Sequence, residues 1–467
     1  MPKHYFAAMT RNKTSLAGTG LVIGSLTLML SLIAIQWVGL RGGAYMGIIT
    51  FIVLPTVLAF GLALIYIGIR RQRKLGESIG IQEAGAFPVV DLNQERTRKA
   101  ILGVVGVGTV SAVVLAAATY KGVEVMDSTP FCGTVCHTVM QPEYTAHQRS
   151  PHARVACADC HIGPGADWFV KAKISGAWQL VAVTFNLYPT PVPTPVHNLR
   201  PARETCEQCH WPATFVGDLL KVKSVYTDDE ANTELKTAVL LKVGGLAGRT
   251  ASGIHWHVNP DVQIRYRSSE DRQTIYDVEL TQPDGTVKVF KPAEETPADA
   301  VDWRVMDCID CHNRPGHAFK LPIDEVDNAM ASGYMDKTLP YLKRESMKLL
   351  KAEYPDHEAA RAGIAQGLTG FYQSIYPDVA KQRSAEIERT VHELQEIYTS
   401  NVFPEMKVTW GTYANNTQHF DSPGCWRCHD RKHKTDDGEK ISRDCGLCHT
   451  IIAQEEENPE LLEQLNP

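Results

Sequence analysis

The sequence predicts a membrane domain of three transmembrane helices, followed by a larger exported region that is mainly helical and irregular, with a small β-rich insertion. Two observations support this prediction. Three long uncharged apolar stretches occur within the first 120 residues, and the twelve cysteines form a regular series after them. The chain of 467 residues is longer than one compact domain usually is. Its formal net charge of −6 gives no indication of nucleic-acid binding.

Three apolar stretches are long enough to cross a bilayer, which takes roughly 20 mostly apolar residues in a helix. We expect spans at about residues 16–40, 44–69 and 100–120, within a membrane domain of residues 1–120. The first stretch is longer than the apolar part of a secretory signal and lacks a clear small-residue cleavage site. We therefore interpret it as a retained span.

The charges that flank the spans predict their orientation. Basic residues precede the first span, and the turn between the first two spans carries only Arg41. The loop 70–99 begins with RRQRK and ends with three more basic residues. Since cytoplasmic loops are enriched in Lys and Arg, we expect this loop and the N-terminus in the cytoplasm. The chain after Tyr120 is then periplasmic, and the membrane is a bacterial inner membrane.

The cysteines form six pairs, and a histidine directly follows the second cysteine of every pair. Five pairs read C-x-x-C-H, the attachment signature of c-type haem, whereas the first reads CGTVCH and has one additional residue. In such a site two thiols bond to the haem and the adjacent histidine ligates iron. Disulfides would not require the histidine, and zinc knuckles do not place it next in sequence. We therefore predict six covalent c-type haems.

The predicted attachment residues are Cys132, Cys136, Cys157, Cys160, Cys206, Cys209, Cys308, Cys311, Cys425, Cys428, Cys445 and Cys448. The predicted proximal iron ligands are His137, His161, His210, His312, His429 and His449. The motifs are numbered one to six in this order.

The exported region divides into four segments. Residues 121–217 hold three motifs in about a hundred residues, so we expect the haems to form much of the core there. Residues 218–303 form the predicted β-rich insertion: VQIRYR and TIYDVEL alternate polar and apolar side chains, and QPDGTVKVF contains an Asp-Gly hairpin signal. Residues 304–400 hold the fourth motif and a helical pattern. Residues 401–467 hold the last two motifs and a charged tail, for which we expect a solvated helix.

Ten histidines of the exported region lie outside the motifs, enough for bis-histidine ligation of most or all irons. Two strong axial ligands leave no open position, which suits electron transfer. In GIHWHV, a strand would place His255 and His257 on one face, and we prefer His257 as the ligand. The candidate distal ligands are Met140, His152, His197, His257, His317, His419 and His433. Those close to a motif in sequence are expected to ligate a neighbouring haem.

With these motifs placed, the chain resembles the NapC/NirT/NrfH family of membrane-anchored multihaem quinol dehydrogenases. The resemblance is strongest over about residues 100–217, where a membrane helix leads into CHTVMQPEYTAHQRSPHARVACADCHIGPGADWFVKAKISG. The resemblance extends, more loosely, to about residue 450. The phrases there that are similar to longer inner-membrane multihaem cytochromes are RPARETCEQCHWP, GIHWHV, NVFPEMKVTWGTY and PGCWRCHD. The resemblance implies a membrane-anchored multihaem cytochrome c that passes electrons from the quinone pool to periplasmic partners.

The resemblance also implies site residues. Met140 corresponds to a methionine that can replace histidine on the first iron, but it lies three residues past His137 where the family has two. We expect one of these two residues on that iron, His137 slightly preferred. Lys173, or Lys171, corresponds to a lysine associated with the quinol site, and Asp167 is the closest match to the family's acidic residue. Three spans and six haems depart from the family's one span and four haems.

Two other functions remain open from the sequence. The chain could be an electron-transfer subunit of a larger respiratory complex without a quinol site of its own. It could also be a terminal reductase, although the surplus of histidines and the lack of a variant haem motif argue against this function.

Overall fold

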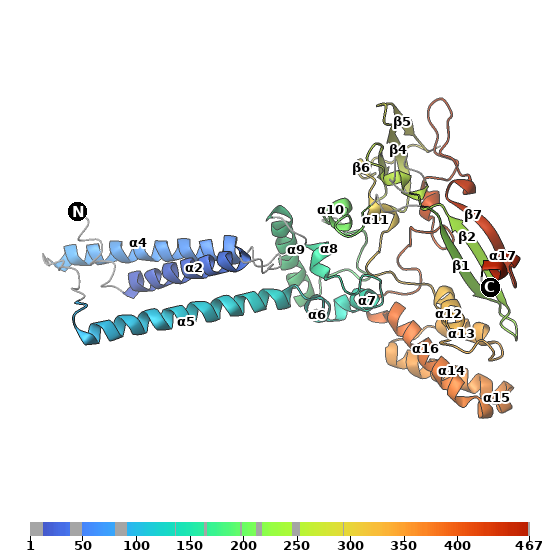
Figure 1. Ribbon diagram of the computed structural model, residues 1–467, viewed down its shortest axis with the longest axis horizontal. Coiled ribbons are helices and arrows are strands. Elements are labelled where there is room, and N and C mark those ends of the chain that lie inside the picture. Colours follow the sequence, from blue (N-terminus) through green and yellow to red (C-terminus); the bar gives the residue numbers. More distant parts are fainter. Residues whose placement is uncertain are drawn as a thin grey trace. The chain divides into compact units, whose positions relative to one another are not determined.

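The computed structural model describes residues 13–37, 49–79, 91–135, 137–162, 166–196, 199–211, 217–244, 253–292 and 294–465 (Figure 1). Backbone contacts divide the chain into two compact units. Unit 1 comprises residues 1–132 and 156–173, and unit 2 comprises residues 133–155 and 174–467.

Three long apolar helices dominate unit 1 (Figure 1). Each contains a stretch long and apolar enough to cross a membrane, which confirms the predicted number of spans. A π-helical turn, η1, leads into the second of them. The elements are α2 (Lys13–Trp37), η1 (Ile49–Val53), α4 (Leu54–Ile79) and α5 (Glu95–Met126).

Helices α2 and α4 approach each other closely where both carry glycine. A Cβ atom added at Gly18 would lie 2.6 Å from the carbonyl oxygen of Gly61, and one at Gly61 would lie 2.9 Å from that of Gly18. Small residues allow such close approach between membrane helices. Gly20 and Gly24 have the spacing of a GxxxG motif, but a Cβ atom at either would meet nothing within 4 Å. The glycines at the helix crossing therefore belong to two different helices.

Short helices and turns carry the cysteine motifs and their surroundings. Their bounds are α6 (Thr129–Thr134), α7 (His137–Gln148), α8 (Cys157–His161), α9 (Ala166–Thr184), α10 (Ala202–Cys206), α11 (Cys308–Cys311), η4 (Pro404–Met406), η5 (Gly424–Arg427) and η6 (Cys445–Leu447).

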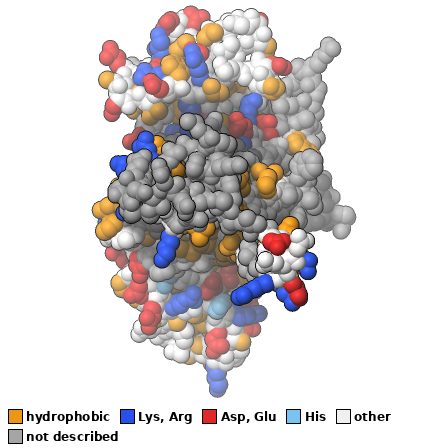
Figure 2. Space-filling view, turned by 90° about the vertical axis from the view of Figure 1, so that its left-hand side faces the viewer, with side chains coloured by type: hydrophobic (Ala, Val, Ile, Leu, Met, Phe, Trp, Pro, Cys, Tyr) orange, Lys and Arg blue, Asp and Glu red, His pale blue; other side chains and the backbone are white. Residues whose placement is uncertain are grey.

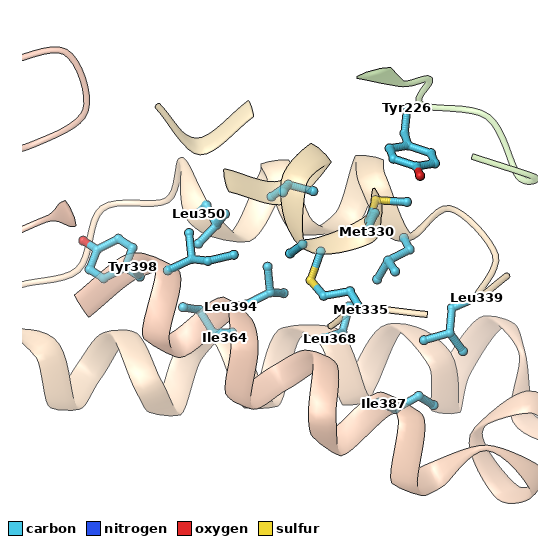
Figure 3. Close-up of a cluster of buried hydrophobic side chains, with 14 of the residues drawn as sticks. Tyr226, Met330, Met335, Leu339, Leu350, Ile364, Leu368, Ile387, Leu394 and Tyr398 are labelled. Atoms are coloured by element: carbon cyan, nitrogen blue, oxygen red, sulfur yellow. The ribbon is translucent and has the colours of Figure 1, made fainter. Parts of the chain in front are cut away.

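Five helices form the largest apolar core of unit 2, as the helical pattern predicts. Figure 3 shows Leu350, Ile364, Leu368 and Leu394 pointing toward one another, and all four are fully buried. Burial of such side chains is the main stabilising contribution of a conventional core. The helices are α12 (Pro322–Ala331), α13 (Leu342–Leu350), α14 (His357–Ile375), α15 (Pro377–Gln382) and α16 (Ser384–Asn401).

Two small antiparallel sheets make the β-rich part of unit 2. Gly285 has φ +83° in the turn between β4 and β5, which confirms the predicted Asp-Gly hairpin. The first sheet has the order β1-β2-β7, from β1 (Leu219–Tyr226), β2 (Glu234–Leu241) and β7 (His449–Glu456). The second has the order β5-β4-β3-β6, from β3 (Gln263–Ser268), β4 (Ile275–Thr281), β5 (Val287–Phe290) and β6 (Arg304–Val305).

The structure differs from the sequence expectation at two places. The segment GIHWHV is a 3-10 turn, η3 (Ile254–Val258), so the strand geometry considered for His255 and His257 does not apply. The N–H of Ile254 donates to the carbonyl of Lys242 over 2.9 Å, which fixes the turn against the end of β2. In the charged tail, the first residues extend β7, and the helix α17 is limited to Glu460–Leu465. The reason is that β2 has an edge whose backbone groups β7 can pair.

Acidic and basic side chains are interspersed on the face drawn in Figure 2, with apolar side chains between them. No large patch of one sign is visible there among the described residues.

Candidate haem sites

Single helical turns carry the standard motifs. In motifs three, four and five, the N–H of the histidine donates to the carbonyl of the first cysteine over 2.8, 2.8 and 3.1 Å. This bond spans four residues and closes one α-helical turn. The two cysteines, three residues apart, then share one face, with the histidine beside the first of them. Two thiols and an imidazole on one side of a turn are what covalent haem attachment requires.

The thiols fit haem better than the alternatives. None of the eleven described cysteines forms a disulfide, and Cys136 lies outside the described residues. Among the described residues, no three His, Cys, Asp or Glu side chains gather as the ligands of a bare metal ion would. Large apolar side chains beside the motifs are exposed, with Trp211 at 62%, Phe420 at 84% and Leu447 at 51%. The flat apolar face of a haem suits such side chains.

Three pairs of imidazole rings each join a motif histidine to one outside the motifs. An iron held by two imidazoles, with metal–nitrogen distances of about 2.0–2.1 Å, sets the ring centroids about 6 Å apart. The pairs therefore have the separation that bis-histidine ligation needs. They are His152 with His210 at 5.9 Å, His257 with His429 at 5.8 Å, and His419 with His449 at 6.3 Å.

His255 lies near the histidine of motif four, a relation that the sequence did not indicate. Burial lowers the pKa of His312, and the nearby His255 and His210 lower it further. The neighbouring His257 meets motif five instead. The two histidines of GIHWHV thus have different neighbours, because a 3-10 turn does not place both on one face as a strand would.

Backbone carbonyls fix the tautomer of several of these histidines. A carbonyl only accepts, so the Nδ1 that faces it carries the proton and Nε2 is the nitrogen suited to a metal. The bonds run from Nδ1 of His152 to Pro315 (3.0 Å), of His255 to Val243 (3.1 Å), of His257 to Ile254 (2.8 Å) and of His429 to Ser442 (2.5 Å).

Other histidines have the opposite arrangement, with Nε2 on a backbone carbonyl. In the candidate ligand His433, Nε2 lies 2.8 Å from the carbonyl of Tyr276 and Nδ1 lies 3.0 Å from Asp430 Oδ1. Its side chain is 2% exposed, so this candidate pairs with no motif in this structure. His147 and His357 likewise place Nε2 on carbonyls, at 3.1 and 2.6 Å.

The candidate His317 faces a carboxylate. Its Nδ1 lies 2.7 Å from Glu143 Oε2. Burial alone would raise the pKa of Glu143, but the hydrogen bond to His317 and the charge of Arg314 outweigh it and lower the pKa to about 2. His197, another candidate, lies outside the described residues, as do the side chains of His137, Asp167 and Lys173.

Motifs three and four are joined directly. The N–H of Ala202, at the start of α10, donates to Asp307 Oδ2 over 2.7 Å, and Asp307 also caps α11. The hydrogen bond between the Cys206 and Cys308 thiols, together with burial, raises the pKa of Cys308. The attachment cysteines of the two motifs are therefore neighbours.

A hydrogen bond joins motifs four and five. Each motif contributes to it one residue that lies between its two cysteines, Asp310 in motif four and Arg427 in motif five. Arg427 Nη2 donates to the carbonyl of Asp310 over 2.6 Å. The Asp310 side chain is 2% exposed and accepts from the hydroxyl of Tyr266 over 2.7 Å and from Arg304 Nε over 3.1 Å. This network anchors both motifs to the second sheet.

Motif six is joined to the end of β2. The N–H of Lys242 donates to the carbonyl of Cys448 over 2.8 Å, and Nζ donates to that of Gly446 over 2.5 Å. Since η3 binds to the same Lys242, the turn that carries His255 and His257 lies among motifs four, five and six. Motifs three to six thus form one connected series within unit 2.

Unit 1 contains the second motif and the first attachment cysteine together with the apolar helices. A hydrogen bond to the Cys157 thiol, and burial, raise the pKa of Cys132. Asp127 follows the end of α5, and its Oδ1 is buried without a hydrogen-bond partner among the described residues. Burial, and then the charge of Asp159, raise the pKa of Asp127 to about 6. The unit therefore holds a proton-accepting group beside two motifs.

The first motif does not form a single helical turn. Its additional residue falls where α6 ends at Thr134 and α7 begins at His137. Met140 is half-buried one turn further along α7. A Cβ atom at Gly133 would lie 2.0 Å from Tyr144 Cδ2, so only glycine fits this close contact. The glycine between the two cysteines of the first motif is the sequence signal for this close contact, and the spacing of the cysteines and histidine does not indicate it.

Three membrane helices and a series of cysteine–histidine turns define a membrane-anchored c-type cytochrome with several haem sites. Residues 94–193 match the model of the NapC/NirT cytochrome c family, N-terminal region. The cytochrome c-type protein ImcH of Geobacter sulfurreducens is 40% identical over 452 residues, covering 96% of this chain and 89% of that protein. The chain belongs to the NapC/NirT cytochrome c family, which confirms the resemblance noted in the sequence.

A shorter match is the cytochrome c-type protein TorC of Escherichia coli, 33% identical over 92 residues, covering 18% of this chain and 23% of that protein. No solved structure matches the chain. The comparisons show that the chain carries covalently bound haem and acts in electron transfer at a membrane.

Proposed function

We propose that this cytochrome oxidises membrane quinol and passes the electrons through six haems to a periplasmic acceptor. The observation that carries the proposal is the content of unit 1, in which Asp127, Cys132 and motif two belong to the same compact unit as the three apolar helices. A quinol dissolved in the bilayer then meets a proton acceptor and an electron acceptor within one unit. When bound, the haems supply a series of one-electron carriers.

Quinol oxidation releases two protons with its two electrons, so the chain needs bases near the membrane surface. Asp127 suits this role because its carboxylate has an unpartnered oxygen and a pKa near 6, close to the pH at which it would work. Lys171 is exposed. The proposed quinol site also includes Lys171, Lys173 and Asp167, because the family resemblance implies a lysine and an acidic residue at these positions.

Helix α9 supports contact with the membrane surface. Ile174, Trp178 and Val181 recur at helical spacing on one face of α9, and Phe185 follows directly after its end. Their side chains are 69%, 62%, 41% and 69% exposed. An apolar stripe that includes a tryptophan is typical of a helix lying in the interface of a bilayer. We infer that α9 lies on the periplasmic surface of a bacterial inner membrane, with the loop 70–99 in the cytoplasm.

The histidine geometry supports an assignment of distal ligands. We assign His152 to motif three, His255 to motif four, His257 to motif five and His419 to motif six. His137 or Met140 binds the first iron. Two axial ligands leave no position for a substrate, which favours electron transfer over the chemistry of a terminal reductase.

The connected series of motifs three to six gives electrons a path through unit 2. The acceptor is a periplasmic redox partner.

Anaerobic reduction by a menaquinol analogue tests the proposal. The purified protein in lipid nanodiscs is expected to show reduced haem bands on addition of the quinol alone, and total haem is measured against protein to check for six. Full reduction by dithionite together with none by quinol would contradict the proposal. Reduction that is lost when co-purifying proteins are removed would instead indicate a subunit of a larger complex.

A further inference from the structure

A buried charge cluster connects α7 to the loop after motif four. Both carboxylate oxygens of Glu143 lie 2.7 Å from Arg314 Nη2, and Oε2 also lies 2.7 Å from His317 Nδ1. The side chains of Glu143 and Arg314 are only 19% and 7% exposed. The three groups therefore form one fixed arrangement rather than a solvated ion pair.

Two aromatic rings hold the arginine of this cluster in place. The guanidinium carbon lies 4.0 Å from the ring centroid of Tyr413 and 5.1 Å from that of Phe319. Arg314 Nε donates to the carbonyl of His317 over 3.1 Å. The arginine thus fixes both the carboxylate and the backbone of the histidine that the carboxylate faces.

The orientation of His317 matches that of the assigned ligands. His152, His255 and His257 each present Nδ1 to an acceptor fixed by the fold, and His317 presents Nδ1 to a fixed carboxylate. A histidine that ligates a metal commonly bonds a carboxylate or a carbonyl through its other nitrogen, which orients the ring and raises its basicity.

We propose that Glu143 is a positioning residue that orients His317 to bind a haem iron through Nε2. The iron is that of a motif to which no distal histidine is assigned above. This inference rests on the six-haem proposal but not on quinol oxidation. Because the anionic carboxylate increases electron donation from the imidazole, it stabilises the oxidised iron and lowers the potential of that haem.

The test is axial-ligand spectroscopy and a redox titration of the full-length, haem-loaded protein with chemical reductants. His317→Ala is expected to convert one low-spin haem to high-spin in the electron paramagnetic resonance spectrum. Glu143→Gln is expected to keep every haem low-spin and to shift one transition to a higher potential. Glu143→Asp retains a carboxylate and is expected to restore most of that shift.

The chain offers a matched control in the second carboxylate–histidine pair, Asp430 and His433. There Nε2 already bonds a backbone carbonyl, so Asp430→Asn and His433→Ala are expected to change no spin state and no potential. If His317→Ala reduces the haem content, the His317→Met variant tests whether residue 317 is an iron ligand. A thioether ligand at this position would raise one haem potential without a high-spin signal.

Unchanged spin states in His317→Ala, or unchanged potentials in both Glu143→Gln and His317→Met, would overturn the inference. Dithionite reduces the haems in every variant whether or not quinol does. A failure of the quinol proposal is therefore distinguishable from a failure of this one.

Discussion

The helical region of α12–α16 and the regions that carry the motifs are stabilised in different ways. In the helical region, side chains such as Leu339, Ile364 and Leu394 are fully buried against one another. Around the motifs, apolar side chains such as Trp211 and Phe420 are exposed, and hydrogen bonds from Asp307, Asp310 and Arg427 join the turns. The helical region therefore buries its apolar side chains without a cofactor, whereas the regions around the motifs leave apolar side chains exposed that bound haem would cover.

Removing a haem attachment site should affect only the second kind of region. Cys308→Ala with Cys311→Ala is expected to lose the haem of motif four and to loosen motifs three and five, because Asp307 and Asp310 connect them. Haem stoichiometry and limited proteolysis would measure this, with α12–α16 recovered as a resistant fragment. Loss of that fragment would contradict the independence of the helical region.

A cavity in the helical core should have the converse effect. Leu368→Ala is expected to lower the free energy of unfolding of this region by about 2–5 kcal/mol, because the side chain is fully buried. Urea denaturation followed by circular dichroism measures the loss, while haem absorbance stays unchanged. Ile375→Ala on the same helix is the control, since Ile375 is 61% exposed and should change stability little. Equal losses in both variants would refute the assignment of the core.

An added methyl group tests how closely the first motif packs. Gly133→Ala places a Cβ atom within 2.0 Å of the Tyr144 ring and is expected to cost about 1–3 kcal/mol. The measurement is thermal unfolding together with haem content. Gly176→Ala is the control, because a Cβ atom there meets nothing within 4 Å. A stable Gly133→Ala variant with all haems attached would show that this contact is not required.

Burial raises the pKa of one acid in each kind of region, but the partners of the two acids differ. Asp327 in the helical region pairs with Lys343 and accepts from the N–H of Tyr226 over 3.1 Å. Asp127 has no such partner for Oδ1 among the described residues, and its pKa is raised to about 6. The raised pKa means that Asp127 is protonated below about pH 6 and becomes a base as pH rises through that value.

Quinol oxidation is therefore expected to speed up as pH rises through about 6, by tenfold or less per pH unit, which is about 1.4 kcal/mol. Asp127→Asn should remove this rise. Asp159→Asn should move it to lower pH, because the charge of Asp159 contributes to the raised pKa. Initial rates of haem reduction across pH 5–8 measure the effect, and identical profiles for all three proteins would exclude Asp127 as the base.

The local features of this protein follow from the sequence. Three apolar stretches predict three helices, and the Asp284–Gly285 pair predicts a hairpin, because each depends on neighbouring residues. The cysteine–histidine spacing places two thiols and an imidazole on one turn for the same reason. The family resemblance was likewise visible in contiguous phrases.

The distal histidines depend on the tertiary structure. His257 and His429 are far apart in sequence, and the sequence did not indicate the 3-10 turn that carries His257. The cluster of Glu143 with Arg314 and His317 joins segments about 170 residues apart, and no pattern in the sequence predicts it. Such long-range pairs depend on how the whole chain packs, and the spacing of residues along the sequence does not predict that packing.

The sequence by itself determined the three apolar helices and the cysteine–histidine motifs, because these are set by spacing within one turn or one apolar stretch. Only the tertiary structure decided which histidines face the motifs and which merely bond a carbonyl, as His433 does. The two kinds of histidine have the same side chain, and their different roles follow from which ring nitrogen the surrounding fold occupies.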